Sequence, residues 1–415
     1  MIIRKKYLFY TLAITSSFIG ALVTAIDTVI GGKYILDPWV FGFAIFFVGA
    51  IVTFLISLIL SIPLKGKSLG SKILDPSFPR LRMIQKGEVK YNIIAGLMNA
   101  VNTIGYCFLI SLVLEPSVIL SFSQVVIVYL LLMESVTEKD IPTLVEVQSS
   151  VIVTFGAILA SISLTGEIKI LPLLIVFLVI NPTWAVFSIY QRKLKLMKIK
   201  NQLNDSINIR FWNVIFSCIF ITVLIFIFDL FTNSQHLLQG MKIVLNPQIF
   251  LMVALTMSTT FFAYVLYIRS LGMGKASINN AIRASTIIFG IPFSILVTVY
   301  FGIPSFSTDP VMLLIKLIGM SLIVLGIISF ALTLVKAYIF IEVKPGVSLE
   351  ETMKKLWGIR GVSHVTITAG RYDFIVKVST RTLMKGYEKI VRKLDEIPEI
   401  QKYKWASVLK DWENI

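Results

Sequence analysis

Amide, guanidinium and indole side chains interrupt several long apolar stretches of this sequence, and such groups bind small polar molecules through hydrogen bonds. The candidates for lining a substrate cavity are Asn99, Asn102, Gln124, Asn181, Trp184, Asn280 and Arg283. Asn99 and Asn102 are three residues apart and would share one face of a helix. Hydrogen bonding between neighbouring helices explains any single amide equally well. Several amides that converge on one point would instead form a polar cavity.

Charged side chains in apolar stretches need a specific explanation, because a charge at the centre of a bilayer costs roughly 3 kcal/mol by insertion scales. Asp27, near the end of the first stretch, is either a coupling group for protons or other ions or part of a solvated helix end. Arg283 and Lys316 either extend to the membrane surface or act as counter-ions for a substrate that carries a carboxylate.

The sequence favours binding over catalysis. It contains no nucleophile motif, phosphate-binding loop or cluster of metal ligands, and His236 and His364 fall on opposite sides of the expected membrane. Cys107 and Cys218 both lie in apolar runs, so a disulfide framework is not indicated. We therefore expect no enzymatic activity, no metal and no cofactor.

The composition indicates that lipid surrounds most of the chain. Hydrophobic residues make up 56% of the 415 residues and charged residues 15%, whereas soluble domains have about 25% charged residues. A bilayer core requires about 20 apolar residues in a helix. Ten stretches satisfy this: 8–30, 39–60, 91–113, 116–133, 144–164, 170–190, 211–231, 248–268, 277–301 and 311–335. The expected fold is an all-α membrane bundle of ten transmembrane helices embedded in a lipid bilayer.

Basic residues between these stretches orient the bundle. With the N-terminus inside, 20 basic residues lie on the cytoplasmic side, including six in 191–210, and three lie outside. This asymmetry follows the positive-inside rule and predicts a multi-pass protein of the cell membrane, prokaryotic in type, with both termini cytoplasmic. The net charge of +16 is then explained by cytoplasmic loops, and no nucleic-acid partner is expected.

Residues 337–415 have a different composition, with 14 basic and 10 acidic residues and no apolar span. Strands are expected at 337–344, 362–369, 372–379 and 402–410, and helices after Ser348 and over 381–396. Ser348 and Glu351 form a capping box at the first helix. The order β-α-β-β-α-β is that of an α+β ferredoxin-like domain.

The membrane part resembles the EamA-type members of the drug/metabolite transporter superfamily. The resemblance rests on span count and spacing, on Glu134, and on the segments PSVILSFSQVVIVYLLLMESV (116–136) and ASINNAIRASTIIFGIPFSILVTVYFGI (276–303). It implies two inverted five-helix repeats, 1–166 and 167–336, with a cavity lined by spans three, four, six and nine. One departure is Ile303, where the family usually has a second Glu.

Residues 337–415 resemble the effector-binding domain of the Lrp/AsnC amino-acid-responsive regulators. The matching segments are AYIFIEVKPG (337–346), IRGVSHV (359–365), AGRYDFIVKV (369–378) and IPEIQKYKWASVLK (397–410). The resemblance implies a homodimer formed through this domain and an amino-acid effector near Gly370, Arg371, Tyr372 and Asp373. Arg371 would pair with a carboxylate and Asp373 with an ammonium group. Alternatively, Gly370 and Asp373 only shape the turn.

These observations predict a secondary transporter, and specifically an exporter, of a small-molecule substrate that could be an amino acid. Amino-acid binding to the C-terminal domain would regulate it, and no polar linker separates the last span from the first strand. The alternative is a membrane sensor or scaffold that uses the same domain but transports nothing.

Overall fold

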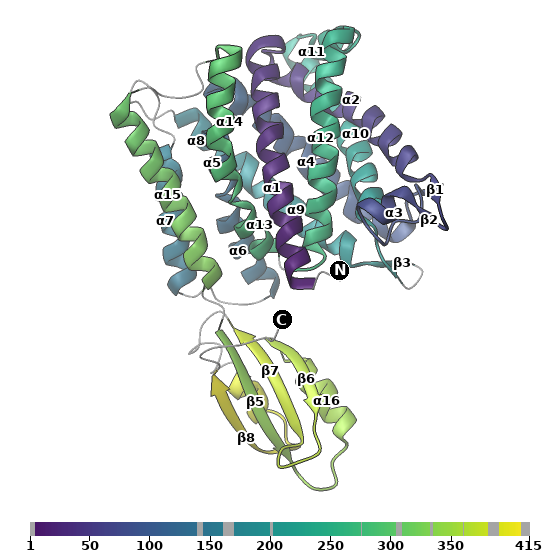
Figure 1. Ribbon diagram of the computed structural model, residues 1–415, viewed down its shortest axis with the longest axis vertical. Coiled ribbons are helices and arrows are strands. Elements are labelled where there is room, and N and C mark those ends of the chain that lie inside the picture. The colour runs from purple at the N-terminus through teal and green to yellow at the C-terminus, as the bar shows by residue number, and fades with distance from the viewer. Residues whose placement is uncertain are drawn as a thin grey trace. The chain divides into compact units, whose positions relative to one another are not determined.

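The structure is a computed structural model that is mostly helical, with a small C-terminal sheet (Figure 1). It describes residues 5–138, 144–160, 170–199, 202–274, 276–303, 309–332, 335–359, 361–380 and 390–407. The chain forms two compact units. The first comprises Met1–Asp140 and Ser149–Ile327, and the second Ile141–Gln148 and Ile328–Ile415. The expected boundary between two halves at residue 166 falls outside the described residues and stays a prediction.

Within the described residues, eight helical segments are long and apolar enough to cross a membrane. They are Leu8–Tyr34, Pro38–Leu60, Lys86–Val113, Pro116–Met133, Ile170–Leu196, Ser206–Thr232, Pro247–Leu271 and Asn279–Phe301. Each lies where a span was predicted. Two more helices, α7 (Leu144–Ala160) and α15 (Pro310–Leu332), lie at the positions of the fifth and tenth predicted spans. The count of ten spans therefore remains an expectation.

The eight segments are built from helices of different regularity. Straight α-helices form α2 (Pro38–Leu60), α4 (Lys86–Val113), α10 (Ser206–Thr232) and α12 (Pro247–Leu271). A π-helix, η1 (Ile30–Tyr34), ends α1 (Lys5–Val29), and a second, η2 (Val176–Ile180), joins α8 (Ile170–Ile175) to α9 (Asn181–Leu196). The short helices α3 (Leu69–Ile73) and α11 (His236–Val244) and two small hairpins lie between the long ones. The hairpins are β1 (Pro63–Leu64) with β2 (Lys67–Ser68), and β3 (Lys198–Ile199) with β4 (Gln202–Leu203).

The fourth and ninth spans are both interrupted. The fourth consists of α5 (Pro116–Ser123) and α6 (Val126–Glu138), and the ninth of α13 (Ala276–Arg283) and α14 (Thr286–Phe301). At both breaks the chain makes short turn hydrogen bonds, such as Val125 N to Phe122 O and Ser285 N to Ile282 O, each 3.2 Å. Interrupted helices leave polar backbone groups that are tolerated in a bilayer only inside protein or beside a cavity.

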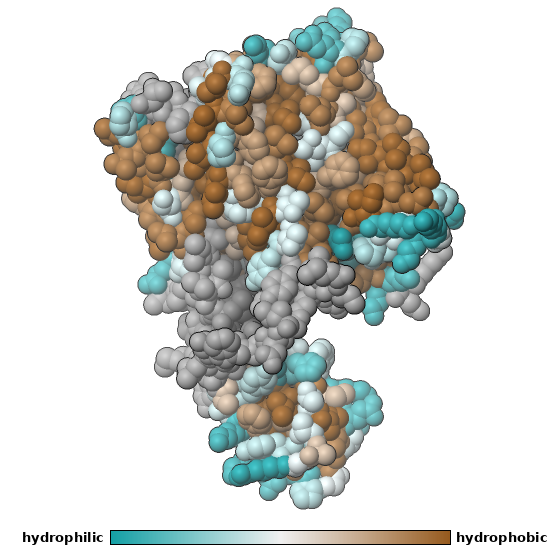
Figure 2. All heavy atoms as spheres, viewed as in Figure 1, coloured by the Kyte–Doolittle hydropathy of each residue, from teal (hydrophilic) through white to brown (hydrophobic). Residues whose placement is uncertain are grey.

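The surface of the helical unit is apolar where its long helices face outward (Figure 2). Large side chains such as Phe231, Leu245 and Tyr300 are 75% or more exposed. Exposed apolar surface of this extent is unfavourable in water. The long apolar helices and this surface are compatible with a membrane protein.

The C-terminal unit contains a four-stranded antiparallel sheet with the order β6-β7-β5-β8. Its strands are β5 (Val335–Val343), β6 (Val362–Ile367), β7 (Phe374–Thr380) and β8 (Ile400–Ser407). Ser348 caps α16 (Leu349–Trp357) by accepting from the backbone N–H of Glu351, which is one half of the predicted capping box. Of the second predicted helix, 381–396, residues 390–395 are helical and 381–389 lie outside the described residues. Leu356, Phe374 and Ile339 belong to its buried core. This arrangement fits the predicted ferredoxin-like domain.

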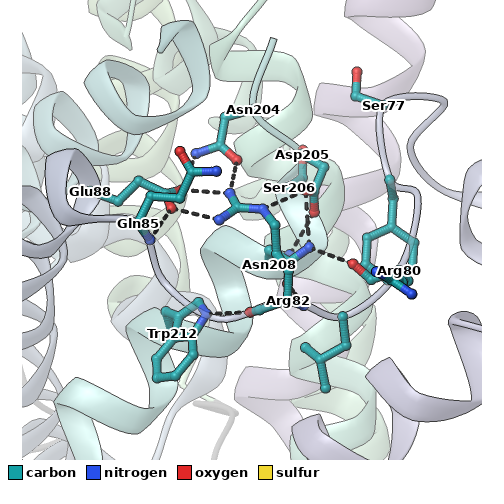
Figure 3. Close-up of polar contacts among 12 residues, drawn as sticks. Ser77, Arg80, Arg82, Gln85, Glu88, Asn204, Asp205, Ser206, Asn208 and Trp212 are labelled. Carbon is teal, nitrogen blue, oxygen red and sulfur yellow. Dashed lines mark hydrogen bonds and ion pairs between the residues drawn. The ribbon is translucent and has the colours of Figure 1, made fainter. Parts of the chain in front are cut away.

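A network of polar side chains joins the loop before α4 to the segment before α10 (Figure 3). Nη1 and Nη2 of Arg82 each donate to a carboxylate oxygen of Glu88 at 2.7 Å, and Nη2 also donates to Asn204 Oδ1 at 2.9 Å. Burial alone would lower the pKa of Arg82, but hydrogen bonds and the charge of Glu88 raise it. In contrast, burial raises the pKa of Asp205 to about 6. The network therefore connects two loops that are far apart in the sequence. It contains the charged pair Arg82–Glu88 and a carboxyl group, Asp205, with a raised pKa.

A buried ion pair joins the fourth and tenth predicted spans. Lys316 of α15 is 6% exposed and its Nζ contacts the carboxylate of Glu115, which is also 6% exposed and precedes α5. Neither alternative proposed for Lys316, extension to the membrane surface or pairing with a substrate, describes this contact. The sequence reading missed Glu115 as a partner because the two residues are 201 positions apart.

Candidate functional site

A cavity of about 160 Å³ lies inside the helical unit. All seven predicted substrate-cavity residues line it: Asn99, Asn102, Gln124, Asn181, Trp184, Asn280 and Arg283. The predicted coupling residue Asp27 lines it as well. The structure thus brings together residues from the first, third, fourth, sixth and ninth predicted spans. Whether they contact a substrate stays a prediction.

Most of the amide groups at this cavity also make hydrogen bonds between helices. Asn99 Nδ2 donates to Asn213 Oδ1 at 3.2 Å and to Ser217 Oγ at 2.9 Å, both in α10. Asn102 Nδ2 donates to the carbonyl of Ile180 at 2.7 Å, at the end of the π-helix η2. π-helical turns leave backbone groups that need other partners. The interhelical explanation of Asn99 and Asn102 therefore holds for their NH₂ groups.

Gln124 and Asn181 make hydrogen bonds at the breaks in the interrupted helices. Gln124 lies at the break of the fourth span, and its Nε2 donates to Thr286 Oγ1, at the break of the ninth, at 3.1 Å. Asn181 Nδ2 donates to the carbonyl of Phe122 at 3.1 Å, while its Oδ1 is buried without a hydrogen-bond partner in the described part of the chain. The two breaks therefore meet at the cavity, where side-chain amides satisfy freed backbone groups.

Aromatic residues surround Arg283 at one end of the cavity. Its guanidinium carbon lies 4.4 Å from the ring centroid of Tyr267 and 5.6 Å from that of Trp184. The Trp184 and Tyr267 rings are stacked, with centroids 5.8 Å apart. Asn280 accepts from the indole nitrogen of Trp184 at 3.4 Å and donates to the Tyr267 hydroxyl at 3.2 Å. Arg283 thus faces the cavity and does not extend along lipid.

Asp27 is 4% exposed, so it is not part of a solvated helix end, and that alternative is wrong. Its two carboxylate oxygens accept hydrogen bonds from Thr256 at 2.7 Å and Tyr106 at 3.1 Å. No Lys, Arg or His of the described ranges lies within 4.0 Å of this carboxylate. A buried carboxylate at a cavity, held by hydroxyl groups alone, can exchange a proton or bind a cation.

Arg210 is the main functional candidate that the sequence reading missed. It was counted among the cytoplasmic basic residues of 191–210, but it lies in the first turns of α10, is 2% exposed and lines the cavity. Its guanidinium carbon lies 4.0 Å from the ring centroid of Tyr264. In the sequence, a buried arginine at the end of a basic loop cannot be distinguished from the basic residues of that loop. Only its position in the structure identifies Arg210 as a cavity residue.

The predicted effector residues lie in the hairpin between β6 and β7. Asp373 Oδ2 accepts from the backbone N–H of Val343 at 2.8 Å, which supports a structural role for this carboxylate. A Cβ added to Gly370 would meet nothing within 4 Å, and its φ is not left-handed, so the turn itself does not require glycine there. The Tyr372 ring lies 5.2 Å from that of Phe340, and Arg371 is exposed on the hairpin. Effector contact by these four residues stays a prediction.

The residues that the structure describes include no group of three or more His, Cys, Asp or Glu side chains able to hold a metal ion. Cys107 and Cys218 are both free thiols. The side chains that line the cavity offer hydrogen bonding, cation–π contact and charge pairing from amides, hydroxyls, arginines and the Asp27 carboxylate.

Comparison with known proteins identifies the C-terminal domain. A family model described as the Lrp/AsnC ligand binding domain matches residues 336–413. The prediction for the C-terminal domain is thus confirmed: it is an Lrp/AsnC ligand-binding domain, which suggests sensing of an amino acid. The matched segment begins one residue before the predicted boundary and covers the four strands except the first residue of β5, Val335.

Similarities over most of the chain are weaker. No curated protein matches the chain. Of 22 matching chains among solved structures, one described only as "Crystal structure of protein" is 14% identical and covers 78% of this chain and 94% of its own length, with a TM-score of 0.45. A similarity at that level carries no argument about function. The EamA-type architecture of the helical unit is not shown by these matches and stays a prediction.

Proposed function

We propose that this protein is a secondary transporter that exports a small metabolite, in the amino-acid class, across the cell membrane. The observation that carries the proposal is the polar cavity of about 160 Å³ inside an apolar helical unit, at which two interrupted helices meet. Transporters with inverted repeats place their substrate sites at such discontinuous helices near the bilayer midplane. The EamA-type architecture, with ten spans in two repeats of five, agrees with breaks in the fourth and ninth spans.

The second part of the proposal is regulation. The Lrp/AsnC domain would bind an amino acid from the cytoplasm at Gly370, Arg371, Tyr372 and Asp373, and would pair with the same domain of a second chain. Both termini would be cytoplasmic, in agreement with the distribution of basic residues. Binding of the effector would change the equilibrium between inward-facing and outward-facing states of the helical unit.

Gly20 offers a direct test of transport through the cavity. It lines the cavity, and a Cβ at this position would lie 3.7 Å from Arg283 Nη2, which is ordinary contact. We expect Gly20→Ala to retain flux of labelled amino acids in proteoliposomes. Gly20→Leu should reduce flux by about tenfold or more, since its side chain fills space that the substrate needs.

The matched pair also separates the transporter from a scaffold. A scaffold would bind amino acids through its C-terminal domain, show no flux in the wild type, and be insensitive to either change at Gly20. Flux that is equal in Gly20→Leu and wild type would contradict transport through this cavity. Thermal unfolding of both variants controls for damage to the fold.

Asp27 is the proposed coupling residue. Asp27→Asn keeps the size of the side chain but cannot ionise, and its NH₂ group must donate to one of the two hydroxyls, Thr256 or Tyr106, that donate to the carboxylate in the wild type. We expect an imposed pH gradient to drive substrate accumulation in wild-type proteoliposomes and to have no effect in the variant, while exchange at equal pH persists. A gradient response that survives the substitution would exclude Asp27 as the proton-coupling group.

A further inference from the structure

Arg210 is a buried cation without a protein counter-charge in the described residues. It is 2% exposed, its Nε has no hydrogen-bond partner there, and its one polar contact is Nη1 to Asn213 Oδ1 at 3.5 Å. The face of its guanidinium is covered by Tyr264 at 4.0 Å. The N–H donors at the edge of the Arg210 guanidinium are thus available to a ligand inside the cavity.

Arg283 also lies over an aromatic ring of α12, that of Tyr267. Its guanidinium carbon lies 4.4 Å from the centroid of Tyr267, and its Nε is likewise unpartnered in the described part of the chain. The Tyr264 and Tyr267 rings of α12 have centroids 6.4 Å apart. Two guanidinium groups therefore stand on neighbouring aromatic rings and line one cavity.

Asp27 lines the same cavity but makes no ion pair with either arginine. Its carboxylate is held instead by the hydroxyl groups of Thr256 and Tyr106. None of the ion pairs within the described ranges includes Asp27, Arg210 or Arg283. An unpaired buried charge is strongly unfavourable, and two adjacent cations increase the penalty. The described residues thus leave two guanidinium groups without an ion pair, and a ligand with two negative charges would match them.

The shape of these groups indicates which anion they bind. A guanidinium edge matches a carboxylate through two parallel hydrogen bonds. The two guanidinium groups lie on different rings, whose centroids are 6.4 Å apart, so each can bind a carboxylate of its own. At 10–15 Å³ for each water position, 160 Å³ holds on the order of ten waters, similar to a small acid of about ten non-hydrogen atoms.

We infer that the transported substrate is a small molecule with two carboxylate groups, one held by Arg210 and one by Arg283, and thus an acidic member of the amino-acid class. This inference rests on the proposed function and names its substrate class. L-Glutamate is the probe that meets the charge requirement. Glutamine has nearly the same shape with one carboxylate, and glutarate has both carboxylates without an amine.

The test uses the full-length protein in proteoliposomes and uptake of labelled L-glutamate against unlabelled competitors. We expect glutamate and glutarate to compete at least about tenfold better than glutamine or inorganic phosphate, because each charge-assisted pair is worth that much. In Arg210→Gln the preference for glutamate over glutamine should disappear while glutamine competition is unchanged. Arg192→Gln is the matched control, since Arg192 donates to the Gly274 carbonyl away from the cavity and should keep the preference.

The outcomes separate this inference from the proposed function. Equal competition by glutamine, stronger competition by phosphate, or an unchanged preference in Arg210→Gln would overturn the dicarboxylate assignment even if flux occurs. If nothing is transported, binding of labelled glutamate to the solubilised full chain decides. Glutamate binding that is lost in Arg210→Gln but kept in Arg192→Gln would support the dicarboxylate site in a protein that does not transport. If no glutamate binding depends on Arg210, the dicarboxylate site is refuted.

Discussion

Lys195→Met is expected to destabilise the protein by about 3–5 kcal/mol, because it leaves a buried carboxylate without its cation. Lys195 is 5% exposed and its Nζ lies 2.6 Å from Asp75, which is 2% exposed. Asp75 Oδ2 also accepts from the backbone and the hydroxyl of Ser206, at 2.8 and 2.7 Å. Thermal unfolding of the solubilised protein measures the loss. A shift as small as that of an exposed lysine would contradict this role.

Two further variants separate the charge from the side chain. Lys90→Met makes the same substitution at an exposed position without an ion pair in the described network, and should change stability by no more than about 0.5 kcal/mol. Asp75→Asn combined with Lys195→Met removes both charges and should recover most of the loss. If the double variant is as unstable as the single one, packing of the lysine stem explains the effect instead.

The pH dependence follows from the sign of the Asp75 shift. Burial alone would raise the pKa of Asp75, but the Lys195 charge and the hydrogen bonds lower it below its ordinary value. A lowered pKa contributes stability that is present above the ordinary value and is lost as the pH falls through the folded one. The difference in the free energy of unfolding between wild type and Lys195→Met should therefore be largest near neutral pH and should become smaller in acid. Asp205, whose pKa is raised by burial and in part by the nearby Asp75 charge, contributes in the opposite direction.

The sequence predicted the elements well because apolar length and strand alternation are local signals. Ser348 and the strand around Ile339 needed only a few neighbouring residues to be identified. The interruptions of the fourth and ninth spans were not predicted. Gln124 and Ser285 lie in apolar runs that read as continuous helices, and the breaks become favourable only when partners such as Thr286 satisfy them.

The site was predicted in part for the same reason. Polar residues within apolar stretches stand out, and Asn181, Asn280 and Arg283 were found in that way and line the cavity. Arg210 and Lys195 were not found, because both follow or belong to a basic segment and look like solvated loop residues. Their burial depends on packing against α12 and on Asp75, 120 positions away from Lys195, which no local pattern encodes.

A flexible insert between the helical unit and the sensing domain is expected to abolish regulation and leave basal transport intact. The sequence placed this junction between Lys336 and Ala337, but β5 begins at Val335 and Ala337 is 2% exposed, paired to Val378 and Ser407. An insert there would disrupt the sheet. Because α15 ends at Leu332, Gly-Ser-Gly-Ser placed directly after Leu332 avoids both elements.

The expected loss follows from the requirements of allostery, in which an effector changes transport only through its different affinities for two states. With a flexible insert, effector binding would no longer bias the helical unit, so the change in flux on adding effector should vanish while effector affinity is unchanged. The same insert after Gly346, in the exposed turn between β5 and α16, should keep the response. A thermal-shift screen of the full chain against the amino acids identifies the effector first. A full response with the insert after Leu332 would rule out coupling through this connection and favour coupling through contacts or dimer formation elsewhere.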